Sequence, residues 1–455
     1  MNRPPELVGK TYCVKTFGCQ MNLHDSERVA GVLDECGCVC VGEPDDADIV
    51  VFMTCCVREK ADQHLYGQAS AMVSAPTPPS GHRVVAIGGC IAQRDGERIR
   101  ENVACADVVF GTSALASLPD LLADAFRDGG GAAHVDVSEE DRPFSTELPS
   151  HREQPFHAWV PIMTGCNNFC TYCIVPYVRG RERSRTMESV VSEVERLVAD
   201  GVREVTLLGQ NVNSYGRTIY GEPRFAELLR KVGQTGIERV RFTSSNPKDL
   251  SDDTIAAMAE VPAVMPHLHL AVQSGSTRIL KAMNRSYTRE EYLDLVARLR
   301  AAIPGMALST DIIVGFPGET EEDFLQTLSL VREAAFSSAF TFIYSRRPGT
   351  PAAKIPDDTP REVIQERFDR LADQVAKQAH EANQDDLGKV VEVLVEGPSK
   401  RDENVLVGHS EKNRTVHFPV PPGLSEREVV GRIARVRVEE ARTWYLRGEM
   451  EGAPR

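Results

Sequence analysis

Three cysteines in the middle of the chain have the spacing of an iron–sulfur site. Cys166, Cys170 and Cys173 follow the pattern C-x3-C-x2-C, and no cysteine comes after them. Iron–sulfur clusters are normally held by four cysteine thiolates. Three thiolates in one loop therefore predict a 4Fe–4S cluster with one iron left open. That open iron suits S-adenosylmethionine, bound through its amino and carboxylate groups.

Three more cysteines each come just after a predicted strand in the N-terminal part of the chain. The strands cover residues 11–16, 48–52 and 84–88, and the cysteines are Cys19, Cys55 and Cys90. Ligands of doubly wound sheets gather at the carboxyl ends of the strands. We therefore expect the three thiols to converge and to ligate a second cluster. The alternative is three structural cysteines, because free cysteine is among the most buried residue types.

Small residues accompany this second set of cysteines. Gly18, Gly88 and Gly89 would let the backbone approach a cluster closely. Cys56 adjoins Cys55 and stays without an assignment. The remaining N-terminal thiols are interpreted as core residues: Cys13, Cys36, Cys38, Cys40 and Cys105.

The elements around these cysteines alternate between strand and helix. Short, near-continuous apolar strands are typical of a parallel sheet buried on both faces. We expect a doubly wound α/β domain over residues 1–127. One of its helices should cover residues 25–35, with Asp25 or Ser26 as the N-cap. Residues 128–154 combine glycine, proline and acidic side chains, which predicts a linker.

The pattern restarts over residues 155–386, with six apolar strands separated by helices. The expected strands are 158–163, 204–211, 239–244, 267–273, 308–316 and 340–345. Six β/α units predict a partial (β/α)6 TIM-like barrel with its active site at the carboxyl ends of the strands. A long charged helix over residues 359–386 is interpreted as a spacer.

Loops after these strands carry glycines and polar side chains that suit a nucleoside. Each of them alone is explained equally well by an ordinary turn. The predicted cofactor-binding residues are Tyr172, Gln210, Asn211, Ser244, Gln273 and Gly315.

Residues 387–450 change to short strands and turns, which predicts a small β-barrel of oligonucleotide-binding (OB-like) type. Basic groups with nearby aromatics, here Trp444 and Tyr445, suit a single-stranded RNA surface. An ordinary solvated strand face is an equal alternative. Together with the arginine-rich run after Cys173, the predicted RNA-binding residues are Arg179, Arg181, Arg185, Lys400, Arg414 and Arg435.

Composition sets limits on these predictions. The chain has 455 residues, which is enough for two to four domains. The net charge of −14 is unusual for a nucleic-acid binder, so any RNA contact has to be local. There is no apolar run long enough for a membrane span and no signal-peptide core at the N-terminus, so we expect a cytoplasmic protein without a membrane partner.

With these residues laid out, the chain resembles the radical S-adenosylmethionine methylthiotransferase family along nearly its whole length. The matching motifs are residues 18–22, 165–177, 179–180, 313–320 and 344–350. Stretches 208–216, 268–270, 272–276 and 394–397 resemble the branch that acts on tRNA. The family plan implies an N-terminal cluster domain, a radical S-adenosylmethionine domain and a C-terminal TRAM domain.

The resemblance also implies cofactors, activity and partners. Two 4Fe–4S clusters are expected, one on Cys166, Cys170 and Cys173 and an auxiliary one on the N-terminal set. One S-adenosylmethionine would be the radical source and another the methyl donor. The implied reaction adds a methylthio group to carbon 2 of N6-isopentenyladenosine at position 37 of tRNA, in the anticodon loop. Expected partners are an electron donor such as flavodoxin or ferredoxin and a sulfur or iron–sulfur carrier, and the protein is expected to be a monomer.

Other functions stay open at this point. The same chemistry acts on threonylcarbamoyladenosine or on a ribosomal-protein side chain in sibling enzymes. A non-catalytic iron–sulfur protein that binds RNA is an alternative of another class. Three departures from the family pattern bear on cluster tuning and substrate fit, namely Met53, Asn246 and Ala271, where the family usually has Asn, His and Pro.

Overall fold

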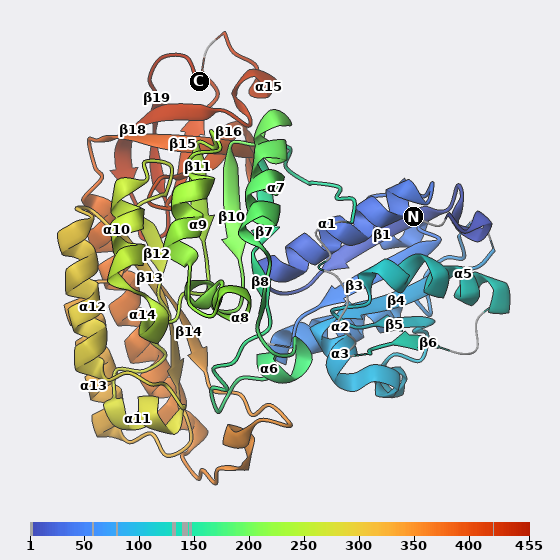
Figure 1. Cartoon of the computed structure of the whole chain (residues 1–455), viewed down its shortest axis with the longest axis horizontal. Coiled ribbons are helices and arrows are strands. Elements are labelled where there is room, and N and C mark those ends of the chain that lie inside the picture. The colour runs from blue at the N-terminus through green and yellow to red at the C-terminus, as the bar shows by residue number, and fades with distance from the viewer. Residues whose placement is uncertain are drawn as a thin grey trace. The chain divides into compact units, whose positions relative to one another are not determined.

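A computed structural model describes residues 3–56, 59–78, 81–129, 133–138, 144, 148–421 and 423–455 (Figure 1). The chain divides into two compact units. The first comprises Met1–Glu153, Trp159–Asn167 and Cys173–Arg183, and the second comprises Gln154–Ala158, Asn168–Tyr172 and Ser184–Arg455. Each unit is described by itself.

The first unit is built on a six-stranded sheet in which every adjacent pair is parallel. The sheet order is β2-β1-β3-β4-β5-β6. This is the doubly wound α/β arrangement predicted from the apolar strands. The strands are β1 (Thr11–Thr16), β2 (Val39–Cys40), β3 (Ile49–Thr54), β4 (Val84–Gly89), β5 (Val108–Phe110) and β6 (His134–Asp136).

Helices cover both faces of this sheet because alternate strand residues point to opposite sides. Val51 and Met53 pack in one core with α1 (Gln20–Glu35) and α5 (Leu118–Asp128). Val50 and Phe52 pack in the other, with α2 (Glu59–Ala71), α3 (Cys90–Asp95), α4 (Ile99–Asn102) and α6 (Val175–Val178).

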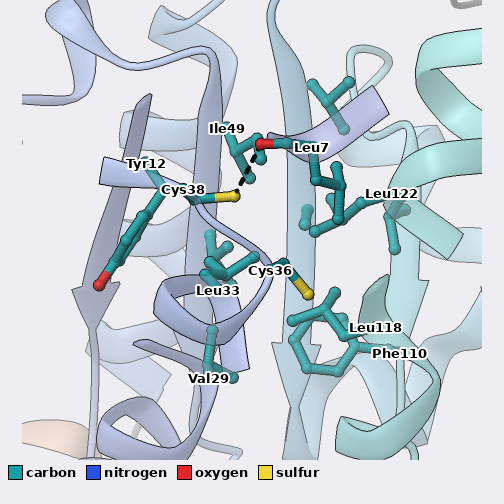
Figure 2. Close-up of a cluster of buried hydrophobic side chains, with 14 of the residues drawn as sticks. Leu7, Tyr12, Val29, Leu33, Cys36, Cys38, Ile49, Phe110, Leu118 and Leu122 are labelled. Carbon is teal, nitrogen blue, oxygen red and sulfur yellow. Dashed lines mark hydrogen bonds between the residues drawn. The ribbon is translucent and has the colours of Figure 1, made fainter. Parts of the chain in front are cut away.

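The cysteines expected to fill space lie mostly in these cores. Figure 2 shows Cys36 and Cys38 in the first core, where the Cys38 thiol donates a hydrogen bond to the Leu7 carbonyl at 3.3 Å. Cys13 packs in the second core. The prediction is wrong for Cys40, which is exposed at the edge strand β2.

The helix expected over residues 25–35 begins earlier. Residue 19 is the N-cap of α1, with extended backbone angles, so Asp25 and Ser26 lie inside the helix and not at its start. Both side chains are buried. The misplacement arose because Cys19 makes no side-chain cap, so the usual N-cap signal was absent from the true start.

The second unit contains the predicted partial barrel. Its strands are β7 (His157–Pro161), β10 (Glu204–Leu208), β11 (Arg239–Phe242), β12 (His267–His269), β13 (Ala307–Val314) and β14 (Ser338–Ile343), with residues 157–158 of β7 belonging to this unit. They form two three-stranded sheets, β7-β10-β11 and β12-β13-β14. Isolated parallel bridges from Val240 to Val264 and from Ser245 to Leu270 connect the two sheets, between β11 and β12.

Helices between these strands close the outside of the half-barrel. Capping boxes start two of them, with Thr288 and Glu291 at α12 and Thr320 and Asp323 at α13. The helices are α7 (Met187–Ala199), α8 (Arg217–Tyr220), α9 (Phe225–Val232), α10 (Asp252–Glu260), α11 (Thr277–Ala282), α12 (Arg289–Ala302) and α13 (Glu321–Ala334). The short strands β8 (Met163–Thr164) and β9 (Arg183–Ser184) complete the chain between β7 and α7.

The long helix α14 (Arg361–Gln384) is not a spacer, contrary to the expectation from its charge. Its buried residues, among them Leu371 and Val375, form a stripe that packs on α13 and β14. Gln378 donates to the Val331 carbonyl at 2.9 Å, and Asn383 donates to the Arg442 carbonyl at 2.7 Å. The helix therefore ties the half-barrel to the C-terminal barrel.

The C-terminal part is a closed five-stranded barrel in the order β15-β16-β17-β19-β18, as expected for an OB-like domain. The fifth strand, β19, lies beyond the strands that the sequence indicated. The elements are β15 (Val390–Ser399), β16 (Asp402–Ser410), β17 (Thr415–Pro419), α15 (Glu426–Val429), β18 (Ile433–Ala441) and β19 (Leu446–Met450).

Two buried arginines fasten this barrel to β11, which begins at Arg239. Arg239 donates to the His409 and Glu392 carbonyls at 3.1 and 2.7 Å. Arg241 donates to the Ser410 carbonyl at 2.7 Å and pairs with the buried Glu204 carboxylate at 2.9 Å. The C-terminal barrel thus sits at the end of the half-barrel opposite to the carboxyl ends of the strands.

Replacing Arg241 by methionine should destabilise the protein by about 3 kcal/mol, because it leaves the Glu204 carboxylate buried without its closest partner. Urea unfolding followed by circular dichroism measures the effect. The matched control is Arg203→Met, which removes a half-exposed ion pair with Glu238 and should cost less than about 1 kcal/mol. Equal losses in the two variants would contradict this account.

Candidate active site

The N-terminal cysteines lie at the carboxyl ends of three adjacent parallel strands. Cys55 directly follows β3, Cys90 is the first residue of α3 after β4, and Cys19 precedes α1 three residues after β1. Cys55 and Cys90 are buried, whereas Cys19 is exposed. The fold therefore brings the three predicted ligands to one edge of the sheet, as the strand pattern indicated.

Contacts among these thiols favour the thiolate form that binds metal. A hydrogen bond with Cys55 lowers the pKa of Cys19 to about 6, and the charge of Arg179 acts in the same direction. A hydrogen bond with Cys56 lowers the pKa of Cys90 to about 7, again with help from Arg179. Cys56, which the sequence left unassigned, is thus a buried neighbour of Cys90.

Arg179 lies inside the first unit, and its guanidinium faces the cysteines. It donates to the Asn22 amide oxygen and to the Asp25 carboxylate, both at 3.1 Å. Although burial alone would raise the pKa of Asp25, the Arg179 charge holds it below its usual value. With only 7% of its side chain exposed, Arg179 does not present the surface that a direct RNA contact needs.

The three glycines near this site differ in what they accommodate. Gly18 has a φ of +130°, and a Cβ there would lie 2.2 Å from the Cys55 Cβ, so it does permit close approach to a proposed ligand. A Cβ at Gly88 would lie 2.1 Å from the Phe110 ring, and a Cβ at Gly89 would lie 2.7 Å from the Thr54 carbonyl oxygen. The latter two therefore serve packing of the sheet.

Replacing Gly18 by alanine should remove the N-terminal cluster, because the new methyl group would displace Cys55. We expect the iron content of the reconstituted protein to fall from about eight to about four irons per chain. Gly9→Ala is the control, since Gly9 also has a positive φ (+77°) but nothing within 4 Å of its Cβ position. Full iron in the Gly18 variant, or equal loss in both, would refute the crowding argument.

Met53, the first of the three departures from the family pattern, is a core residue. Its side chain is fully buried in the core with Val29, Leu33 and Phe110. It therefore packs on the α1 and α5 side of the sheet as an apolar core residue.

The loop with the three central cysteines is fixed by backbone contacts. Cys166 and Cys170 are buried, and Cys173 is half-buried. In the second unit, Asn284 donates to the Asn168 and Phe169 carbonyls at 3.2 and 3.0 Å. Phe169 has a φ of +46°, a left-handed conformation that non-glycine residues adopt rarely and that clusters at functional sites.

A further cation that the sequence did not single out lies beside this loop. Arg285 places its Nη1 3.6 Å from the Cys170 sulfur. Its other nitrogens are held by the Ala271 carbonyl at 2.6 Å and the Tyr287 hydroxyl at 2.7 Å. Arg285 therefore places a positive charge directly beside a proposed cluster ligand. No spacing pattern marks Arg285, because it comes from the turn after α11, far from the cysteines in sequence.

The two sets of three cysteines supply only sulfur ligands. Within the described part of the chain, no three Cys, His, Asp or Glu side chains already surround one point where a single ion would bind. Sulfur-rich sets of three thiols are the donors that iron–sulfur clusters take.

The loops at the carboxyl ends of the half-barrel strands contain unpaired polar atoms. Asn211 is buried after β10 and donates to Asp249 at 2.7 Å. Its Oδ1 and the Gln210 Oε1 have no hydrogen-bond partner among the described residues. Two buried acceptors without partners are costly unless a ligand donates to them.

Backbone strain marks the next two loops. Ser244 after β11 and Gln273 after β12 have φ angles of +63° and +71°, so both are left-handed. Gln273 still keeps the sheet ladder, since its amide donates to the Asp311 carbonyl at 2.9 Å. Strain of this kind persists where surrounding contacts enforce it and is common at ligand sites.

Tyr172 and Phe316, the residue after Gly315, belong to the same apolar cluster. Tyr172, from the cysteine loop, packs against Met283, Phe316 and Ala352. Gly315 precedes Phe316 and has a φ of +71°. The structure therefore places the six predicted cofactor-binding residues in the loops after the strands.

Two departures from the family pattern are built into this region. Asn246 accepts a hydrogen bond from the Lys248 amide at 3.3 Å and caps the short turn 247–249. At Ala271 the carbonyl accepts from Arg285, so this position works through its backbone.

The predicted RNA-binding residues fall into two groups. Arg185 pairs with Glu193 at 2.6 Å and Arg414 with Asp386 at 2.6 Å, and both side chains are at least nine-tenths buried. Like Arg179, they hold the fold together and are not available on the surface. Arg181, Lys400 and Arg435 are exposed.

Comparisons with known proteins agree with this architecture. The family model described as Radical SAM superfamily matches residues 160–331, that described as Uncharacterized protein family UPF0004 matches residues 11–111, and that described as TRAM domain matches residues 384–450. A tRNA-2-methylthio-N(6)-dimethylallyladenosine synthase of Acetivibrio thermocellus is 48% identical over 444 residues, covering 97% of this chain and 91% of that protein. The synthase of Acidothermus cellulolyticus is 52% identical over 413 residues, covering 90% and 82%.

The chain belongs to the radical S-adenosylmethionine methylthiotransferase family. The fold of this methylthiotransferase also resembles that of a radical S-adenosylmethionine methyltransferase, TsrM, from Kitasatospora setae. That similarity has a TM-score of 0.56 at 14% identity and covers 76% of this chain and 77% of the other. At such low identity it supports the fold alone.

Proposed function

We propose that this methylthiotransferase adds a methylthio group to carbon 2 of N6-isopentenyladenosine at position 37 of tRNA. The observation that carries the proposal is the pair of cysteine triads in a chain that matches a tRNA-2-methylthio-N(6)-dimethylallyladenosine synthase over 97% of its length. Adenine carbon 2 offers no useful acid–base handle on its C–H bond, so the reaction calls for radical chemistry.

We propose Cys166, Cys170 and Cys173 as ligands of the cluster that binds S-adenosylmethionine. Cys19, Cys55 and Cys90 would hold the auxiliary 4Fe–4S cluster. When bound, the two clusters and S-adenosylmethionine supply the one-electron chemistry, the sulfur and the methyl group that amino-acid side chains lack.

The chain's own residues would hold and shield these groups. Arg179 helps to lower the pKa of Cys19 and of Cys90, which favours thiolates there, and Arg285 places a positive charge 3.6 Å from the Cys170 sulfur. The unpaired acceptors on Gln210 and Asn211 match the amino N–H and ribose hydroxyl donors of S-adenosylmethionine. Tyr172, Ser244, Gln273 and Gly315 would complete the same site.

We propose that tRNA contacts Arg181, Lys400 and Arg435, whose side chains are exposed. Trp444 is 60% exposed and can stack on a base of a single-stranded loop. The target adenine would be splayed out of the anticodon loop to reach the half-barrel.

The remaining expectations are part of the same proposal. The division into domains 1–127, 155–386 and 387–450, joined by a linker at 128–154, follows the family plan. An electron donor such as flavodoxin or ferredoxin, a sulfur carrier, a monomeric state and a cytoplasmic location belong to it as well. None of the helices in the described ranges is long and apolar enough to span a bilayer.

An anaerobic reaction tests the assignment. The protein is reconstituted with iron and sulfide and given reductant, S-adenosylmethionine and tRNA carrying isopentenyladenosine. The tRNA is then digested, and its nucleosides are analysed by mass spectrometry. We expect a methylthio adduct of isopentenyladenosine. The same assay with tRNA carrying threonylcarbamoyladenosine is the control, and an adduct on that nucleoside alone would overturn the substrate.

A further inference from the structure

We propose that Arg367 on α14 is a positioning residue for the glycine loop 315–319 at the S-adenosylmethionine site. This inference rests on the proposed function, because it takes that loop as part of the cofactor site. It concerns a helix that the charge pattern had marked as a spacer. The contacts behind it all lie within the second unit.

The loop is closed on itself by one carboxylate. The Gly315 amide donates to the Glu319 Oε2 at 2.8 Å, which bends the chain just after β13. Glu319 is buried, with 4% of the residue exposed. A buried carboxylate needs a charged partner, and that partner comes from another element.

Arg367 supplies this partner from the first turns of α14. Its Nη1 lies 3.6 Å from the Glu319 carboxylate and donates to the Glu319 carbonyl at 3.0 Å. Its Nε donates to Glu321 at 3.1 Å. Arg367 is itself buried, with 5% exposed. The Arg367 guanidinium therefore contacts both the carboxylate and the backbone carbonyl of Glu319, the residue that closes the loop.

Packing between α14 and Gly315 also holds the loop in place. A Cβ at Gly315 would lie 2.7 Å from Ile364 Cγ2, so α14 packs directly on the glycine. Gly315 needs its positive φ at this place, and no larger residue fits. Helix α14 thus covers the loop at Ile364 and anchors it at Arg367.

The position of this loop reaches the cysteine loop through packing. Phe316 follows Gly315, is 1% exposed, and shares an apolar cluster with Tyr172. Tyr172 lies between Cys170 and Cys173 in the chain. A loop released at Glu319 would therefore loosen the wall on which a cofactor held by the cysteine loop has to lie.

Charges around Glu319 make the arrangement sensitive to pH. Burial raises the pKa of Glu319 to about 7. The hydrogen bond from the Gly315 amide and the charge of Arg367 lower this pKa, whereas the charges of Asp323 and Glu321 on α13 raise it further. Arg278 on α11 also faces this group. Because the pKa of Glu319 is raised where it is buried, the closed loop binds the proton more tightly than an open loop would, so the loop should loosen as the pH rises through about 7.

The test compares Arg367→Gln with Arg370→Gln in the reconstituted full chain. Arg370 also pairs with Glu321, at 2.8 Å, but has no contact with Glu319 given by the structure. We expect Arg367→Gln to raise the KM for S-adenosylmethionine about tenfold, the cost of a charged hydrogen bond, with kcat changed far less. The readout is 5′-deoxyadenosine formation without tRNA, which does not depend on the substrate assignment.

Two further readouts separate positioning from simple destabilisation. Hydrogen exchange of amides 313–319 should speed up in Arg367→Gln and stay as in the wild type in Arg370→Gln. The KM should rise between about pH 6 and about pH 8 in the wild type and stay flat in Glu319→Gln, which cannot titrate. Arg367→Lys, which keeps the charge, covers the case in which Arg367→Gln fails to fold and should give an intermediate KM.

An unchanged KM in both Arg367 variants, with only a lower melting temperature, would overturn the proposal. Failure to methylthiolate tRNA while these 5′-deoxyadenosine results hold would instead count against the proposed substrate.

Discussion

Alanine at Cys166, Cys170 and Cys173 together should halve the iron content, from about eight to about four irons per chain, and abolish 5′-deoxyadenosine formation. The reason is that these three thiols are the proposed ligands of the cluster that binds S-adenosylmethionine. Without them neither the open iron nor the cofactor has a place. Iron analysis and chromatography of 5′-deoxyadenosine after anaerobic reconstitution measure both effects.

Cys105→Ala provides the control for this experiment. Its half-buried thiol donates to the Ala69 carbonyl at 3.2 Å and lies outside both triads. That variant should keep all its iron and its activity. If the triple variant retained full iron, the assignment of the central triad would be wrong.

The second large effect concerns Cys19, Cys55 and Cys90. Their replacement by alanine should also leave about four irons per chain, but with a different loss of activity. 5′-Deoxyadenosine should still form, because the central triad is intact, whereas no methylthio product should appear. Comparing the two triple variants therefore separates the radical source from the sulfur donor.

Cys56 gives a close control for this second triad, because it is adjacent to Cys55 in the chain and forms a hydrogen bond with Cys90. Cys56→Ala should keep about eight irons, whereas Cys55→Ala should lose about four. The reverse result would mean that the ligand at this strand end is Cys56.

Much of the scaffold could be predicted because strand patterns are local. Apolar runs such as 48–52 and 84–88 became β3 and β4, and parallel pairing then brought the cysteines after them to one edge. The six strands of the half-barrel were found for the same reason. The spacing of Cys166, Cys170 and Cys173 needed no structure at all.

Contacts between distant segments were out of reach of the sequence. The arginine-rich run after Cys173 looked like an RNA surface, yet Arg185 folds back onto Glu193 and Arg179 onto Asp25. Whether a guanidinium faces solvent depends on which carboxylate tertiary folding brings to it. The same applies to Arg414, which Asp386 neutralises from the end of α14.

Helix α14 shows how charge can mislead. Its many charged residues indicated a solvated spacer, because few apolar residues mark its buried stripe. Part of that stripe is polar, namely Arg367, Gln378 and Asn383, and these side chains donate hydrogen bonds to other elements. A buried polar face has no periodic hydrophobic signal to be found.

The most direct test of the central claim follows one hydrogen atom. tRNA bearing isopentenyladenosine deuterated at carbon 2 is supplied to the reconstituted protein with reductant and S-adenosylmethionine. The mass of the 5′-deoxyadenosine is then measured by mass spectrometry. The account predicts that 5′-deoxyadenosine gains the deuterium while the methylthiolated nucleoside loses it. Unlabelled 5′-deoxyadenosine together with a nucleoside that keeps its deuterium would contradict the claim that this enzyme acts at carbon 2.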